Sequence, residues 1–253
     1  MATNSIQATR DEMVTTNTDP GAVFHWLSRA VGDFKAAPIN ALIYGFGFFV
    51  VSWLVIGFLW LTGLEWMIFP AVAGALLVGP FLAVGLYRES RRIAGHGGTG
   101  VASPGQIALV GAILMVFLLA WFRAATILYA LLFGLKPFPG LPDLLVQLFT
   151  TMEGISLLVV GTAVGGLFAA CCFAISIYSI PMLVDRKVDA FSAMGMSFAK
   201  AARFPRLTIA WGVVVTVLAV LGFATLMLGM IVIFPILGFA TWHAYASMFG
   251  TPD

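Results

Sequence analysis

The sequence predicts an all-α, polytopic membrane protein with six transmembrane helices, arranged as three helical hairpins with both termini in the cytoplasm. Three observations lead to this fold class: the composition, the length of the uncharged stretches and the uneven distribution of basic residues. Of the 253 residues, 61% are hydrophobic and 9% are charged, whereas roughly a quarter of the residues of a soluble domain are charged. The composition therefore excludes a soluble domain with a single core.

The chain begins with a polar segment, residues 1–21, which is rich in Thr, Asn, Ser and Asp. Such a segment buries too little apolar surface to offset the entropy of ordering, so we expect a disordered cytoplasmic tail. In residues 22–37, apolar side chains recur at helical spacing with Arg29, Asp33 and Lys35 between them. This pattern predicts an amphipathic helix at the cytoplasmic membrane interface.

Five uncharged stretches follow, each long enough to cross a bilayer, because a helix needs about 20 mostly apolar residues to span a hydrocarbon core of about 30 Å. They are residues 36–64, 66–87, 93–122, 154–184 and 207–252. The apolar body of the last stretch would be about 58 Å long as one helix, nearly twice the core, so it predicts two spans with a turn near residues 224–229. The count is six, and residues 38–249 form the predicted transmembrane domain.

The basic residues fix the expected orientation. Six spans place 11 of the 13 Lys and Arg residues on the side of the two termini. Because cytoplasmic loops carry the excess of Lys and Arg, this side is expected to be cytoplasmic. On the other side, Lys136 opens residues 136–152, in which a short interfacial helix is expected from Pro142.

An internal repeat suggests the three hairpins. A proline precedes a glycine by seven residues at the start of the first, third and fifth spans: Pro38 and Gly45, Pro104 and Gly111, Pro205 and Gly212. Proline suits a helix start because its missing N–H would be unpaired there. The second, fourth and sixth spans each contain one proline, namely Pro80, Pro181 and Pro235. We infer three hairpins, each preceded by a cytoplasmic interfacial segment.

Arg123, within or at the outer end of the third span, is the first candidate functional residue, because a charge near the membrane is costly. Two alternatives are open. In a structural role, the side chain extends to the interface or pairs with Glu153, which precedes the fourth span. In a functional role, it contacts a substrate or an ion. The hairpin geometry favours a pair between Arg123 and Glu153.

A second candidate group lies at the inner end of the fourth span. Asp185 and Asp189 are one helical turn apart, near Arg186 and Lys187. A pair of carboxylates at the interface would suit a lipid-handling enzyme. More commonly, however, such a group is a solvated charge cluster at the start of a helix.

The composition excludes several kinds of site. The net charge of +2 and the lack of a basic block with aromatic residues argue against a nucleic-acid partner. The only two cysteines, Cys171 and Cys172, are neighbours and provide neither a disulfide framework nor a four-thiolate metal site. None of the three histidines, His25, His96 and His243, lies in the middle of a span, so we expect no haem, copper or other cofactor.

Three segments carry a family resemblance: residues 26–38 running into Tyr44 and Gly45, residues 79–88, and residues 173–185 followed by 189–194. The third contains Pro181 and Asp185. Together they resemble the bacterial family of predicted integral membrane proteins known as domain of unknown function 2189, over about residues 24–247. The resemblance implies a bacterial inner-membrane protein of about six helices, and it implies no activity or cofactor.

These observations favour a non-enzymatic accessory, assembly or scaffold component of a membrane complex, since no polar catalytic set lies within the spans. The expected partners are the lipid bilayer and other subunits of such a complex. The alternative is a small transporter or permease, which the repeat and the prolines in the even-numbered spans suggest. A lipid-handling enzyme is the third hypothesis.

Overall fold

The computed structural model describes residues 19–95, 100–134 and 138–250. Within these ranges the chain forms helices and no strand. The predicted disordered tail lies outside the described residues up to residue 18, as do His96 and Lys136. The elements are α2 (Ala22–Ala36), α3 (Pro38–Leu61), η1 (Glu65–Met67), α4 (Ile68–Leu82), α5 (Val84–Ile93), α6 (Pro104–Phe133), α7 (Leu141–Thr150), α8 (Met152–Ser176), α9 (Ser179–Asp185), α10 (Ala190–Arg203), α11 (Pro205–Ala224) and α12 (Met230–Phe249).

Six membrane-spanning segments are confirmed by length and hydropathy. They are α3, η1 with α4, α6, α8 with α9, α11 and α12. The predicted turn in the last apolar stretch is also present, between Ala224 and Met230. Two non-glycine residues in this turn, Leu226 and Met227, have positive φ angles of 53° and 66°, a conformation that lets the chain reverse within a few residues.

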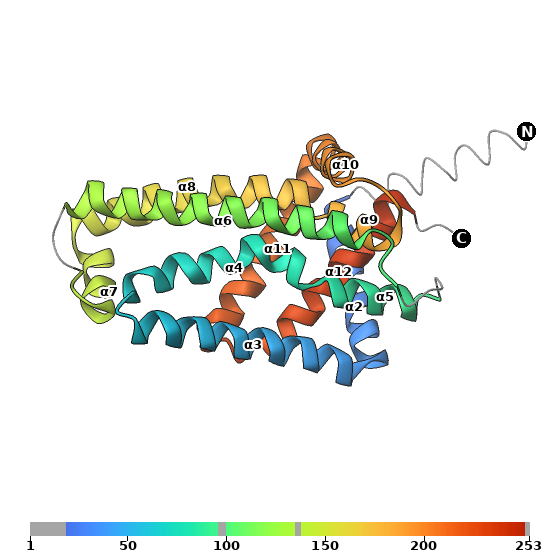
Figure 1. Cartoon of the computed structure of the whole chain (residues 1–253), viewed down its shortest axis with the longest axis horizontal. Helices are drawn as coiled ribbons and strands as arrows, with labels where there is room; N and C mark the ends of the chain where they lie inside the picture. Colours follow the sequence, from blue (N-terminus) through green and yellow to red (C-terminus); the bar gives the residue numbers. More distant parts are fainter. Residues whose placement is uncertain (1–18, 96–99, 135–137, 251–253) are drawn as a thin grey trace, which may run out of the picture.

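Helices α3, α4, α6 and α8 run along the long axis of the molecule, whereas α11 and α12 cross behind them (Figure 1). Helix α7 lies at one end. At the other end are α2, α5, α9, α10 and the last turns of α12, and we call this the basic end because ten Lys and Arg residues lie on or directly beside these elements. Of the most apolar window of each span, 67% is buried in α12 but only 6–22% in the other five spans. Helix α12 is therefore the central helix.

Helix α3 approaches the backbone of α12 closely. A Cβ atom built on Gly45 would lie 1.9 Å from the carbonyl oxygen of Ile231, so only glycine permits this contact. Three residues later the ring of Phe48 stacks on Phe234, with 4.6 Å between the ring centroids. Small residues allow helices in a bilayer to pack through their backbones, and here they join the first span to the last.

The first predicted hairpin is not a packed pair. Helix α3 packs mainly on α12, and α4 packs on α6 and α8. A cavity of about 450 Å³ separates residues of α3 from residues of α4, and Leu118, Phe122 and Phe234 of neighbouring helices close it. The first span therefore pairs with the last one, and the second span packs on the third and fourth spans instead of on the first.

The three proline-led helix starts share one geometry. Pro38, Pro104 and Pro205 each lie in the first turn of their helix. The residues before them have nearly the same backbone angles, with φ between −121° and −137° and ψ between 59° and 66°. Proline restricts the preceding residue away from the helical region. Each proline thus sets the direction in which a span leaves the basic end.

Two even-numbered spans are broken at the basic end. The second uncharged stretch runs to residue 87, but α4 ends at Leu82 and α5 begins after Ala83, just beyond the internal Pro80. In the fourth span, α8 ends at Ser176 before α9 begins. There the hydroxyl of Ser197 in α10 accepts a hydrogen bond from the Tyr178 N–H (3.2 Å) and donates one to the Ala174 carbonyl (2.8 Å). A side chain inserted between helical partners interrupts the helix.

The contact at Gly45 gives a testable prediction. Gly45→Ala should destabilise the protein by about 1–3 kcal/mol, because the added methyl group forces the backbones of α3 and α12 apart. Unfolding in detergent micelles, followed by circular dichroism, measures the change. Gly47→Ala is the matched control, since no atom lies within 4 Å of a Cβ atom there. Equal unfolding temperatures for the two variants would contradict the close approach.

Candidate functional site

The buried charges of the described chain gather at the basic end. All four ion pairs among residues 19–95, 100–134 and 138–250 lie there. Two groups have buried carboxylates. We call them the Asp185 cluster, formed by Arg91, Asp185, Arg186 and Tyr245, and the Asp33 cluster, formed by Asp33, Ser90 and His243. Each cluster takes one residue from α5 and one from α12, so these two helices connect both.

Asp185 is the last residue of α9, a short helix whose seven residues are all buried. The carbonyl groups at the end of a helix need partners outside it. The Ala102 N–H donates to the carbonyl of Val184 (3.1 Å), and the Ser103 N–H donates to that of Leu183 (3.0 Å). The loop before α6 thus anchors the end of α9 and holds Asp185 in place.

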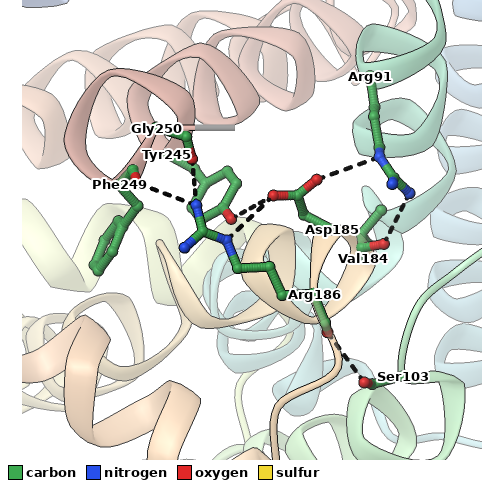
Figure 2. Close-up of polar contacts among 8 residues, drawn as sticks. All are labelled: Arg91, Ser103, Val184, Asp185, Arg186, Tyr245, Phe249 and Gly250. Atoms are coloured by element: carbon green, nitrogen blue, oxygen red, sulfur yellow. Dashed lines mark hydrogen bonds and ion pairs between the residues drawn. The ribbon is translucent and has the colours of Figure 1, made fainter. Parts of the chain in front are cut away.

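The carboxylate of Asp185 is fully buried and has three partners (Figure 2). The Tyr245 hydroxyl donates to Oδ2 at 2.7 Å. The guanidinium Nε atoms of Arg91 and Arg186 lie 3.3 Å from Oδ1 and 3.4 Å from Oδ2, although the Arg91 contact lacks hydrogen-bond alignment. A buried carboxylate is costly unless it is paired, and two cations compensate this one.

Both arginines also bind main-chain carbonyl groups (Figure 2). Arg91 Nη1 donates to Val184 at 3.3 Å, and Arg186 Nη2 donates to Phe249 at 3.0 Å and to Gly250. A cation at the last carbonyls of a helix interacts favourably with the helix dipole. The Asp185 cluster therefore ties α5, α9 and the end of α12 together through ion pairs and hydrogen bonds within the protein.

A third, more exposed group joins α5 to α3. Glu89 pairs with Arg92 at 2.6 Å and accepts a hydrogen bond from Asn40 Nδ2 at 2.9 Å. The hydrogen bond from Arg92, supported by the one from Asn40, lowers the pKa of the Glu89 carboxyl below its usual value. This carboxylate is therefore ionised at neutral pH.

The Asp33 cluster connects α2 to α5 and α12. Asp33 Oδ2 accepts a hydrogen bond from the Ser90 hydroxyl and lies 2.9 Å from His243 Nε2. Asp33 continues the buried face of α2, which also includes Trp26. The rings of Trp26 and Trp211 pack in a T-shaped arrangement, with 5.8 Å between their centroids. The first helix described is thus fixed to the last one by a carboxylate and an imidazole.

An open pocket borders the Asp33 cluster. It has a volume of about 800 Å³ and lies between α2, the end of α5 and the end of α12. Its polar lining includes His25, Arg29, Asp33, His243 and Ser247. It is the part of the basic end where charged side chains meet an accessible space.

The sequence candidates occupy different places. Pro181 and Asp185 lie together in α9 at the basic end. Asp189 is exposed, and its Oδ1 accepts a hydrogen bond from the Ser192 N–H at 2.9 Å at the start of α10. Hydrogen bonds from Ser192 lower the pKa of Asp189. Asp185 is buried and Asp189 caps a helix, so the two carboxylates do not form a pair.

The predicted pair of Arg123 and Glu153 is wrong. None of the ion pairs found in the described chain joins them. Trp121 packs on Phe168, with 6.1 Å between the centroids, and also contacts Gly165. At 1.5 Å per residue, this register places Glu153 about 15 Å nearer the α7 end than Arg123. Arg123 instead lies on the outward face of α6, among Val116, Leu119, Ile127 and Leu131, all more than half exposed.

Asp33, His243, Arg91 and Tyr245 were not predicted as site residues. One signal was present for Asp33: it falls at helical spacing on the apolar stripe of Val23, Trp26 and Ala30, and a charge on such a stripe requires a buried partner. The partners themselves are distant in sequence, since His243 lies 210 residues from Asp33. No local pattern indicates them.

The hydrogen bond between Tyr245 and Asp185 can be tested by substitution. Tyr245→Phe should lower the free energy of unfolding by about 1.5–3 kcal/mol, because the buried carboxylate loses its closest donor. Denaturant unfolding in detergent measures this loss. Tyr129→Phe is the matched control, because no hydrogen bond of the Tyr129 hydroxyl occurs in the described structure. If Tyr245→Phe and Asp185→Asn have additive effects, the two residues do not interact.

Comparison with known proteins supports the resemblance. Residues 68–185 match the model of the family described as "Predicted integral membrane protein (DUF2189)". The match runs from α4 to the end of α9 and includes Arg91, Pro181 and Asp185, but it is shorter than the expected residues 24–247. No curated protein and no solved structure matches the chain. From the second span to the buried Asp185, the chain is therefore similar to this family of integral membrane proteins of unknown function.

Proposed function

We propose that the protein is a non-enzymatic accessory, assembly or scaffold component of a membrane complex, and that its basic end is the functional surface. The observation that carries the proposal is the separation of polar and apolar features. The ion pairs of the described residues all lie at the basic end. The interior of the spans has apolar cavities.

Three cavities between the spans support this proposal against the transport of a polar substrate. One of about 540 Å³ lies between α4, α6, α7 and α8, and the cavity of about 450 Å³ lies between α3 and α4. A third, of about 80 Å³, adjoins α12. Their described linings have no charged side chain. Transporters of polar substrates place polar groups and helix ends near the middle of the membrane.

The broken spans also differ from a transporter site. The breaks after Leu82 and Ser176 lie towards the basic end (Figure 1). At the second break, the hydroxyl of Ser197 engages the Tyr178 N–H and the Ala174 carbonyl, so these main-chain groups are bound by the protein. An enzymatic role of Asp185 is disfavoured for a similar reason, because its carboxylate is enclosed by Arg91, Arg186 and Tyr245.

The proposed location is the bacterial inner membrane, with the basic end in the cytoplasm. The support is the distribution of charge, because Lys and Arg are concentrated in cytoplasmic loops. Exposed aromatic side chains on α10, Phe191 at 68% and Phe198 at 55% exposure, lie close in sequence to exposed basic residues. This combination suits contact with the headgroup region or with a partner subunit.

The orientation is tested by labelling single cysteines in intact cells. In a background of Cys171→Ala and Cys172→Ala, a cysteine at Lys187 should remain unlabelled by an impermeant thiol reagent until the cells are opened. A cysteine at Asp143 in α7 should react in intact cells, because α7 lies at the opposite end (Figure 1). The reverse pattern would place the basic end outside.

The role in a complex is tested by purification in mild detergent. The wild-type chain should retain a partner subunit in stoichiometric amount. Replacing three exposed basic residues, Lys187, Arg203 and Arg206, with Gln should reduce this partner at least tenfold. As a control, Arg123→Gln removes one positive charge from the outward face of α6, away from the basic end, and should retain the partner. A chain that purifies alone with a bound small molecule would contradict the proposal and favour the transporter.

A further inference from the structure

We propose that the open pocket at the basic end binds a phosphate-bearing ligand through Arg29 and His25 of α2. This inference is independent of the proposed scaffold role, because it concerns a pocket formed within one chain. Its volume of about 800 Å³ lies within the range of about 300–1,000 Å³ typical of small-molecule sites. It is therefore larger than a site for a bare ion needs to be.

The charges around the pocket divide into engaged and unengaged groups. His25, Arg29 and Asp33 follow one another at intervals of four residues and line the same pocket. Asp33 is already engaged by Ser90 and by His243 at 2.9 Å. Neither His25 nor Arg29 has a hydrogen-bond or ion-pair partner in the part of the chain that the structure describes. The pocket residues without a partner in the described chain therefore include an arginine and a histidine, and both are exposed and can donate to a ligand.

This arrangement selects an oxyanion. The planar guanidinium group of arginine matches the geometry of phosphate oxygens and binds them in pairs. The imidazole of His25, one helical turn away, carries an N–H group that can act as a second donor. The carboxylate of Asp33 is not a free acceptor in the pocket, because it already accepts a hydrogen bond from Ser90 and lies 2.9 Å from His243 Nε2.

The pocket also has room beside these donors. Gly32 belongs to its wall, and no atom lies within 4 Å of a Cβ atom built at this position. A larger side chain at residue 32 would therefore project into open space without a clash. Gly32→Leu should therefore fill the pocket while keeping the fold, since leucine also has a higher helix propensity than glycine.

Two sources supply the same phosphate chemistry at this place: a lipid headgroup and a soluble phosphate ester. The purified full-length chain in detergent is titrated with each, and each has a phosphate-free counterpart. The soluble pair is sn-glycerol 3-phosphate and glycerol. The lipid pair is dioleoyl phosphatidic acid and dioleoylglycerol. Intrinsic tryptophan fluorescence reports binding, because Trp26 and Trp242 line the pocket.

We expect saturable binding of at least one phosphate compound and none of its counterpart. Arg29→Gln should weaken the binding at least tenfold, and Gly32→Leu should abolish it without lowering the unfolding temperature. Lys35→Gln is the matched control, because Lys35 is exposed on the same helix but does not line the pocket. Binding of phosphatidic acid alone identifies a headgroup site, and binding of glycerol 3-phosphate identifies a site for soluble esters.

Two results would overturn the proposal. The first is the absence of saturable binding for both phosphate compounds. The second is an equal loss of binding in Arg29→Gln and Lys35→Gln, which would show attraction to the general positive charge of α2. Circular dichroism of every variant confirms that the helices are retained, so a folding defect is separated from a lost site.

Discussion

The need to neutralise a buried carboxylate shapes the basic end of this protein. Asp185 has no exposed side-chain surface, and an isolated charge in such a place would be unstable. Its compensation requires Arg91 from α5, Tyr245 from α12 and the neighbouring Arg186 at once. Since α5 continues from the second span and α9 from the fourth, one carboxylate fixes the relative positions of three spans.

The rest of the bundle depends on close packing around α12. In a bilayer, apolar side chains gain little by leaving lipid for another helix, so small residues and good fit decide which helices associate. Gly45 lets α3 reach the backbone of α12 at Ile231, and Gly238 of α12 lies against Leu86 of α5. The central helix is thus held by glycine contacts within the span and by polar contacts at its end.

The two carboxylate clusters differ in what they leave accessible. The Asp185 cluster is closed, because its donors and acceptors are shared among α5, α9 and α12. The Asp33 cluster borders a pocket, and the neighbouring His25 and Arg29 on α2 face that pocket. This contrast separates a structural network from a candidate binding site, although both lie at the same end of the molecule and share two helices.

The sequence by itself determined the class, the number of spans, the proline-led helix starts and the turn between the last two spans. These features are local: the length and apolarity of a segment decide whether it can span a bilayer, and proline at positions such as Pro38 acts on its own helix. Tertiary structure alone decided that α3 pairs with α12, that Arg123 faces outward and that Asp33 meets His243, 210 residues away. These depend on the register and approach of distant helices, and hydropathy contains no information about either because lipid and helix surfaces are equally apolar.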